Sequence, residues 1–199
     1  MDAPIDNVAY RLTRHHSERT RPAGVHCYSE YTRHLDAGAT TLIIDSGPDQ
    51  WLDLGHIPDN IDITITGQTC AAVTGGSITA AGRCFLQATH HAHVSAYEFA
   101  HVEAFDTTTI EAHGESRIVG TDNADIRADE HAIVFAHCQC HVHADGHTRI
   151  AATDTTTVAI GGDAHVRASA GVHITGENQS TNLTIDTRPI SRLADHLNR

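Results

Sequence analysis

The amino-acid sequence predicts an all-β fold, a two-sided parallel β-helix or β-solenoid whose sixteen-residue coils each consist of two octads. The first observation behind this prediction is that apolar residues recur at every eighth position, at Cys70, Ile78, Leu86, Val94, Val102, Ile110, Ile118, Ile126, Val134, Val142, Ile150, Val158, Val166 and Ile174. The second is that small or apolar neighbours lie two positions away, as in Ala132, Val134 and Ala136. A fixed period is typical of a solenoid, and spacing by two is typical of a strand rather than of a helix.

The remaining positions of each octad predict a corner. Four residues after most of the apolar positions comes a residue that suits a turn, at Gly82, Glu98, Asp106, Gly114, Asp122, Glu130, Gly146, Asp154, Gly162 and Asn178. Gly, Asp and Asn tolerate the backbone angles of a tight corner. A single strand cannot bury its own apolar face, so we expect two octads to run out and back, with their apolar residues facing each other.

The segment from Ala104 to Glu111, Ala-Phe-Asp-Thr-Thr-Thr-Ile-Glu, resembles the octapeptide repeat of bacterial ice-nucleation proteins, whose consensus is AGYGSTLT. The resemblance lies in the alanine, the small hydroxyl residues and the aliphatic residue, and it covers about residues 70 to 176. It implies the coil geometry, and it also implies an ice-interacting protein as an alternative function. The tyrosine of the consensus is absent, because its position holds residues such as Asp106 and Gly114.

Both ends of the chain depart from the repeat, and the sequence predicts three segments. Residues 1–40 form a polar N-terminal segment with a short helix near Ser29–Leu35. Residues 41–178 form the solenoid, which begins with irregular coils. Residues 179–199 form a C-terminal cap with a short amphipathic helix over Pro189–Asn198.

The phase of the repeat slips near each end of the solenoid. Ile63 lies seven residues before Cys70, which predicts that one corner between them is a residue short. The apolar residue expected at Asn182 occurs instead at Leu183, which predicts one extra residue in the preceding segment. We expect Trp51, the single tryptophan, to cover the end of the core.

Composition restricts the partners and the compartment. The net charge is −12 and there is no lysine, which argues against nucleic-acid binding, because such proteins carry a basic stripe. This composition suggests a bacterial or phage protein. No apolar run suits a signal peptide or a membrane span, so we expect no membrane partner. Four of the five cysteines, Cys70, Cys84, Cys138 and Cys140, fall at inward or corner positions of the coil, which favours small core residues in a reducing, cytoplasmic environment.

Outward side chains of successive coils stack into columns sixteen residues apart. One face combines the column Phe85, His101, Arg117, Ile133, Arg149 and His165 with the column Gln87, Glu103, Val119, Phe135, Ala151 and Arg167. The apolar centre of this face consists of Val119, Ile133, Phe135 and Ala151, and its rim consists of Arg117, Arg149 and Arg167. An apolar centre with an arginine rim predicts a protein interface, with a homodimer or another protein as the partner. The alternative is that the N-terminal segment or the C-terminal helix covers these residues.

The opposite face is polar and carries the column Ser77, His93, Thr109, Asp125, His141, Thr157 and His173. An ice-binding face needs a regular array of small hydroxyls, which Asp125 and His141 interrupt. His141 and His143 lie two apart on one face, with Asp125 one coil away, so the three could form a weak, incomplete site for zinc or another divalent metal. The 18 histidines could also make assembly pH-responsive.

Catalytic signals are weak. Carboxylates in the solenoid fall at corners such as Asp106, Asp122 and Asp154, which is turn chemistry rather than a paired acid and base. The sequence has no phosphate-binding glycine loop and no nucleophile elbow. We therefore expect a non-catalytic scaffold that needs no cofactor and presents a rigid surface for self-association or protein binding.

Overall fold

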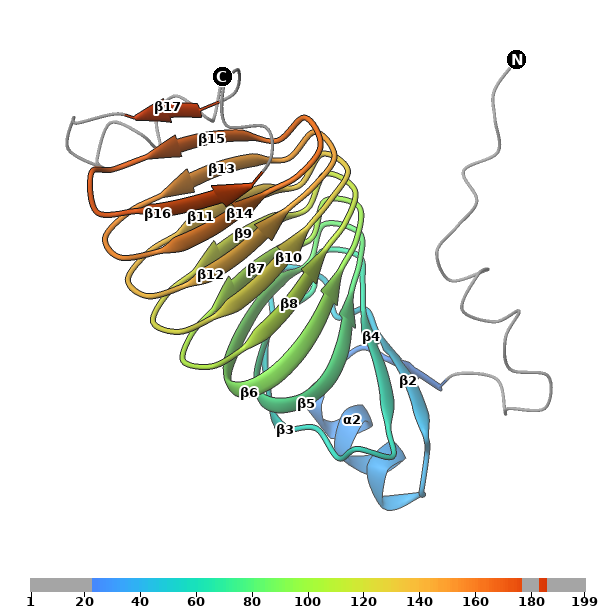
Figure 1. Ribbon diagram of the computed structural model, residues 1–199. Coiled ribbons are helices and arrows are strands. Elements are labelled where there is room, and N and C mark those ends of the chain that lie inside the picture. Colours follow the sequence, from blue (N-terminus) through green and yellow to red (C-terminus); the bar gives the residue numbers. More distant parts are fainter. Residues whose placement is uncertain (1–22, 177–182, 186–199) are drawn as a thin grey trace, which may run out of the picture.

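The computed structural model describes residues 23–176 and 183–185, and these residues form a parallel β-solenoid of about 10 turns (Figure 1). The predicted fold class is confirmed, with about 16 residues per turn. The elements in chain order are β1 (Ala23–Val25), α2 (Tyr28–Asp36), β2 (Thr41–Ile44), β3 (Trp51–His56), β4 (Asp62–Ile65), β5 (Cys70–Ala80), β6 (Phe85–Ala96), β7 (His101–Ala104), β8 (Thr109–Ala112), β9 (Arg117–Gly120), β10 (Asp125–Ala128), β11 (Ile133–Ala136), β12 (His141–Ala144), β13 (Arg149–Ala152), β14 (Thr157–Ile160), β15 (His165–Ala168), β16 (His173–Gly176) and β17 (Leu183–Ile185).

The strands form two faces because each strand pairs with the strand one full coil away. Face A consists of β3, the first parts of β5 and β6, and then β7, β9, β11, β13, β15 and β17. Face B consists of β1, β2, β4, the last parts of β5 and β6, and then β8, β10, β12, β14 and β16. All of these pairings are parallel, and from Val94 to Gly176 the register stays at sixteen residues per coil, as the octad pattern predicts.

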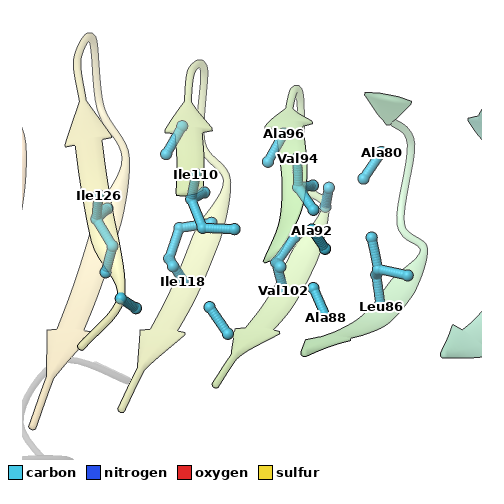
Figure 2. Close-up of a cluster of buried hydrophobic side chains, with 14 of the residues drawn as sticks. Ala80, Leu86, Ala88, Ala92, Val94, Ala96, Val102, Ile110, Ile118 and Ile126 are labelled. Carbon is cyan, nitrogen blue, oxygen red and sulfur yellow. The ribbon is translucent and has the colours of Figure 1, made fainter. Parts of the chain in front are cut away.

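The core lies between the two faces and contains mostly one large aliphatic residue per strand, flanked by alanine. Figure 2 shows Ile110, Ile118 and Ile126 pointing into this space beside small residues such as Ala96. All four side chains are fully buried. Burying one such isoleucine contributes about 1.5–3 kcal/mol relative to exposure, so the stack of coils has a continuous hydrophobic core.

The corners adopt the left-handed backbone conformation that the turn residues predict. Positive φ angles occur at every expected turn position from Gly82 to Gly162, and also at His90 and Cys138, which the sequence did not signal. Several corner carboxylates accept a hydrogen bond from the backbone N–H of the corner one coil earlier. Asp106 Oδ2 lies 3.0 Å from the His90 nitrogen, and Asp154 Oδ2 lies 3.0 Å from the Cys138 nitrogen. The carboxylates therefore stabilise the turns, as expected for turn chemistry.

The first coils depart from the sixteen-residue repeat, and the short corner is not where the sequence placed it. Ile63 pairs with Ile78, one residue fewer than a full coil, but the missing residue is at Thr74 rather than between Ile63 and Cys70. The prediction that Cys70 points inward is therefore wrong. Ala71 is buried in its place and pairs with Leu86. Small residues on both sides of Cys70 made the two parities indistinguishable in the sequence.

Helix α2 covers the N-terminal end of the solenoid, at the lower right of Figure 1. Its bounds, Tyr28–Asp36, agree with the helix expected near Ser29–Leu35, and Gly38 follows its end with a φ of 77°. Tyr31 is buried, and its hydroxyl lies 3.4 Å from the carbonyl oxygen of Leu54 in β3. Trp51 does not cover the core, contrary to expectation, because it points outward and is 50% exposed.

The C-terminal phase slip is confirmed. Val166 in β15 pairs with Leu183 in β17, one residue more than a full coil. The expected helix over Pro189–Asn198 and the tail before residue 23 lie outside the described residues. Upstream of residue 41, β1 already pairs in parallel with β2, so the parallel sheet includes residues 23–25.

Candidate functional site

The residues named as an interface lie together on face A. In β11, Ile133 lies between Arg117 and Arg149 of the neighbouring strands, and Phe135 lies between Val119 and Ala151. Ile133 and Phe135 point away from the core, because Val134 takes the inward position between them, and Val119 points the same way in β9. All three side chains are half-buried. The structure therefore brings the predicted apolar residues side by side on an outward surface.

Ala151 differs from its neighbours. It has outward parity but is only 4% exposed, since the longer side chains of Phe135 and Arg167 precede and follow it in the same column. Ala151 is therefore a small, covered position between two larger residues, and it adds little exposed apolar surface to face A.

The arginines of the rim lie on three strands of face A. Arg149 in β13 is exposed, whereas Arg117 in β9 and Arg167 in β15 are half-buried. These three cations stand out in a chain whose net charge is −12. They lie on the part of face A that follows β7, so the positive charge is concentrated toward the C-terminal coils.

An aromatic cluster lies on the N-terminal part of face A, where Phe85 and His101 are neighbours as their column predicts and Trp51 is an additional member that the sequence analysis did not place there. The ring centroids of Trp51 and Phe85 are 5.9 Å apart, and those of Phe85 and His101 are 5.1 Å apart with an edge-to-face arrangement. Beside them, the Gln87 amide donates to the Glu103 carboxylate at 3.0 Å. The signal that could have found the cluster is the parity of β3, where Leu52 and Leu54 point inward and place Trp51 outside.

His101 is the most constrained titratable group of this surface. Its Nε2 atom is buried and has no hydrogen-bond partner among the described residues. Burial lowers the pKa of His101, because charging an imidazole removed from water is unfavourable. Glu103 acts in the opposite direction and raises this pKa, while Arg117 lowers it further. His101 is therefore held in its neutral form against the Phe85 ring.

The residues proposed as a metal site lie on face B. Asp125 in β10 pairs with His141 in β12, so these two are neighbours across one coil, and all three candidates are exposed. The neighbour of His143 in that coil is Arg127, a cation that opposes metal binding. Within residues 23–176 and 183–185, no three His, Cys, Asp or Glu side chains are grouped so that they could hold a metal ion. Metal binding by Asp125, His141 and His143 stays a prediction.

Face B otherwise has the mixed polar character that the sequence predicts. Asp125 and His141 lie between Thr109 and Thr157 in one column, so the hydroxyl series is interrupted. A shallow hollow of about 290 Å³ opens near the ends of β8, β10 and β12, and it is lined by both signs of charge. His113 on its wall is hydrogen-bonded to Asp129 at 2.8 Å. Ice binding stays a prediction from the resemblance alone.

The cysteines divide into buried and accessible groups. Burial raises the pKa of Cys84 to about 12 and that of Cys140 to about 11, so both stay protonated and act as small core residues. Cys138 is exposed at a corner, and Cys27 and Cys70 are half-buried. The five cysteines are all free thiols.

Comparisons with protein families, with curated proteins and with solved structures give no match. Among the described residues, no helix is long and apolar enough to span a membrane. A fold of this kind is a scaffold and does not imply an activity, so the chemistry of the two outward faces decides what the solenoid can bind.

Proposed function

We propose that this protein is a non-catalytic scaffold that binds protein, in the first place itself, through face A. The observation that carries the proposal is the row of outward apolar side chains, Val119, Ile133 and Phe135, which lies beside Arg117 and Arg149 on neighbouring positions of a regular sheet. Exposed apolar surface with an arginine rim is typical of protein interfaces.

The solenoid supports this role by holding the surface rigid. Each strand from β7 to β15 is paired on both sides, so its outward side chains keep fixed positions from coil to coil. A surface that is ordered before binding loses less conformational entropy when a partner docks. Face A therefore needs little rearrangement to form an interface.

Light scattering at several concentrations tests the proposal on the wild-type protein and on Phe135→Glu. We expect the wild type to associate and the variant to stay monomeric, because a buried, unpaired carboxylate at the centre of an interface is strongly unfavourable. The matched control is Thr109→Glu, which adds the same charge at an outward position of face B. Circular dichroism checks that each variant keeps its strand content.

Equal masses for the wild type and Phe135→Glu, with association retained, would contradict face A as the interface. A wild type that is monomeric at every concentration would contradict self-association.

A further inference from the structure

Charge is distributed unevenly along face A. The strands before β9 carry the acidic side chains Asp53 and Glu103. Arg117 lies on β9, Arg149 on β13 and Arg167 on β15, and the outward apolar residues Val119, Ile133 and Phe135 lie on β9 and β11. Face A thus carries its acidic side chains on the N-terminal strands and Arg149 and Arg167 on the C-terminal strands, while Arg117 lies beside the apolar residue Val119 on β9.

This order makes the surface complementary to a copy of itself turned end for end. We propose that the partner is a second copy of this chain, docked face A on face A with the solenoid axes antiparallel and a twofold axis between β9 and β11. The inference rests on the proposed function and specifies its partner and geometry. A twofold dimer uses the same surface on both copies, so complementarity must exist within that one surface.

The register of the strands shows what this arrangement brings together. A twofold axis along the strand direction between β9 and β11 places β9 over β11 of the partner and β7 over β13. Val119 then faces the partner copy of Phe135, and His101 faces the partner copy of Arg149. Glu103 faces the small residue Ala151, which leaves room for the adjacent arginine to reach its carboxylate.

The exposed state of Arg149 and the constrained state of His101 fit this pairing. Arg149 has a long, exposed side chain, so its guanidinium can move toward Glu103 of the partner copy without breaking a buried contact in its own chain. His101 is held neutral, so it does not repel the guanidinium. A carboxylate and a guanidinium that meet across an interface determine how the two copies are oriented more than they increase the affinity.

The parallel orientation is disfavoured by the same charges. A twofold axis along the solenoid would place each coil over the same coil of the partner. Arg149 and Arg167 of one copy would then approach Arg149 and Arg167 of the other. Like charges that meet in a partly desolvated interface are unfavourable. The antiparallel arrangement leaves Arg117 near Arg117 and Arg149 of the partner copy, but it keeps the two Arg149 side chains apart and the two Arg167 side chains apart. It also places Arg149 and Arg167 near Glu103 of the partner copy rather than near their own counterparts.

The size of the contact predicts a weak dimer. Six strands of face A, from β6 to β15, overlap in this geometry, and at about 4.8 Å per strand they span about 29 Å. Four residues per strand give a width of about 13 Å. The product is roughly 380 Å² per copy, which is below the size of standard specific interfaces and corresponds to weak, transient association. Sedimentation velocity over a wide concentration range is therefore the suitable measurement.

The test is complementation between two charge-reversal variants, Glu103→Arg and Arg149→Glu. Each variant alone places like charges at both symmetric contacts, and we expect its dissociation constant to rise by about tenfold or more. In a one-to-one mixture, the heterodimer regains opposite charges at both contacts, and we expect its dissociation constant to return to within about threefold of the wild type. Glu111→Arg and Arg127→Glu, which lie at outward positions on face B, are the matched controls and should leave association unchanged.

The outcomes separate the two proposals. A mixture that associates no better than the single variants would overturn the antiparallel geometry, while loss of the dimer in Phe135→Glu would still support face A as the interface. Weakening by the face B controls equal to that of the face A variants would overturn both. Since all four substitutions are at outward positions, thermal unfolding identifies any variant whose fold is affected.

Discussion

At the scale of single residues, the corners of the solenoid place residues with side chains in a left-handed backbone conformation that favours glycine. His90, Glu98, Asp106, Asp122, Glu130, Cys138 and Asp154 all have φ angles between 54° and 59°. This conformation costs a residue with a side chain roughly 1–2 kcal/mol. Where the corner residue has a carboxylate, a hydrogen bond from the preceding coil offsets this cost. At Glu98, for example, the carboxylate accepts from the backbone N–H of Gly82 at 2.9 Å.

Cys138 is a corner residue without such a carboxylate, so its replacement tests this account. We expect Cys138→Asn to stabilise the protein by about 0.5–1 kcal/mol, because asparagine tolerates the left-handed conformation and its amide oxygen can accept from the Asp122 N–H. Urea unfolding measures the change. Cys138→Ala is the control, because alanine has no side-chain acceptor, and equal stability of the two variants would contradict the explanation.

His101 gives a pH dependence whose sign follows from its environment. Its pKa is lowered in the folded protein, chiefly by burial, so the folded state binds a proton less readily than the unfolded chain. The free energy of unfolding therefore falls as the pH drops through the ordinary histidine range, and this loss ends once folded His101 is itself protonated. We expect His101→Phe, which keeps a ring against Phe85, to lose less stability over this range than the wild type.

The control for this prediction is His165→Phe. His165 lies in the same column as His101 but is exposed in β15, so this variant makes the same change of ring outside the buried contact with Phe85. Nuclear magnetic resonance titration of the His101 ring provides a direct measurement. A midpoint at or above the value of a free histidine would contradict the account.

At the scale of the elements, the regular strands were predictable and the first coils were not. The octad phase places Val134 and Ala136 inside and Ile133 and Phe135 outside, because Val134 continues the eight-residue series of inward apolar residues on either side of β11. From Thr69 to Val73 every residue is small or apolar, so either parity satisfied the sequence. Only the pairing of β5 with β6 fixes the parity, and pairing between distant segments is not visible in a local pattern.

Helix α2 is the element that terminates the core at its N-terminal end. Tyr31→Ala should cost about 3 kcal/mol of local stability, because it removes a buried aromatic ring from the contact between the helix and β3. In a solenoid each coil contacts mainly its neighbours, so the effect should remain close to the cap. We expect faster amide hydrogen exchange in β1–β3 and unchanged exchange in β11–β15.

Tyr31→Phe is the matched control for this prediction. It removes the hydroxyl, which makes a 3.4 Å contact with the Leu54 carbonyl oxygen, but keeps the ring, so exchange in β1–β3 should change little. Accelerated exchange throughout the solenoid in Tyr31→Ala would contradict local action of the cap and would indicate that the coils unfold as one unit.

At the scale of the whole molecule, the sequence predicted the position of the apolar surface better than its chemistry. The sixteen-residue period was enough to align Val119, Ile133 and Phe135, because stacking in a solenoid follows directly from residue numbering. The same period aligned Phe85 with His101, but the contact of Trp51 with Phe85 was missed, since Trp51 lies in the irregular first coils. The low exposure of Ala151 could not be predicted either, because it depends on how the longer neighbouring side chains lie.

The placement of consecutive octads on opposite faces has a consequence for how such a chain can change in length. Loss or gain of sixteen residues would remove or add one coil and leave every column in place. Loss of eight residues would preserve the alternation that buries the core, yet everything downstream would change sides, so that the arginines would continue the column of threonines and histidines. The chain thus has a spatial reading frame of two octads. A shift of one octad keeps the fold but moves the downstream surface residues to the opposite face.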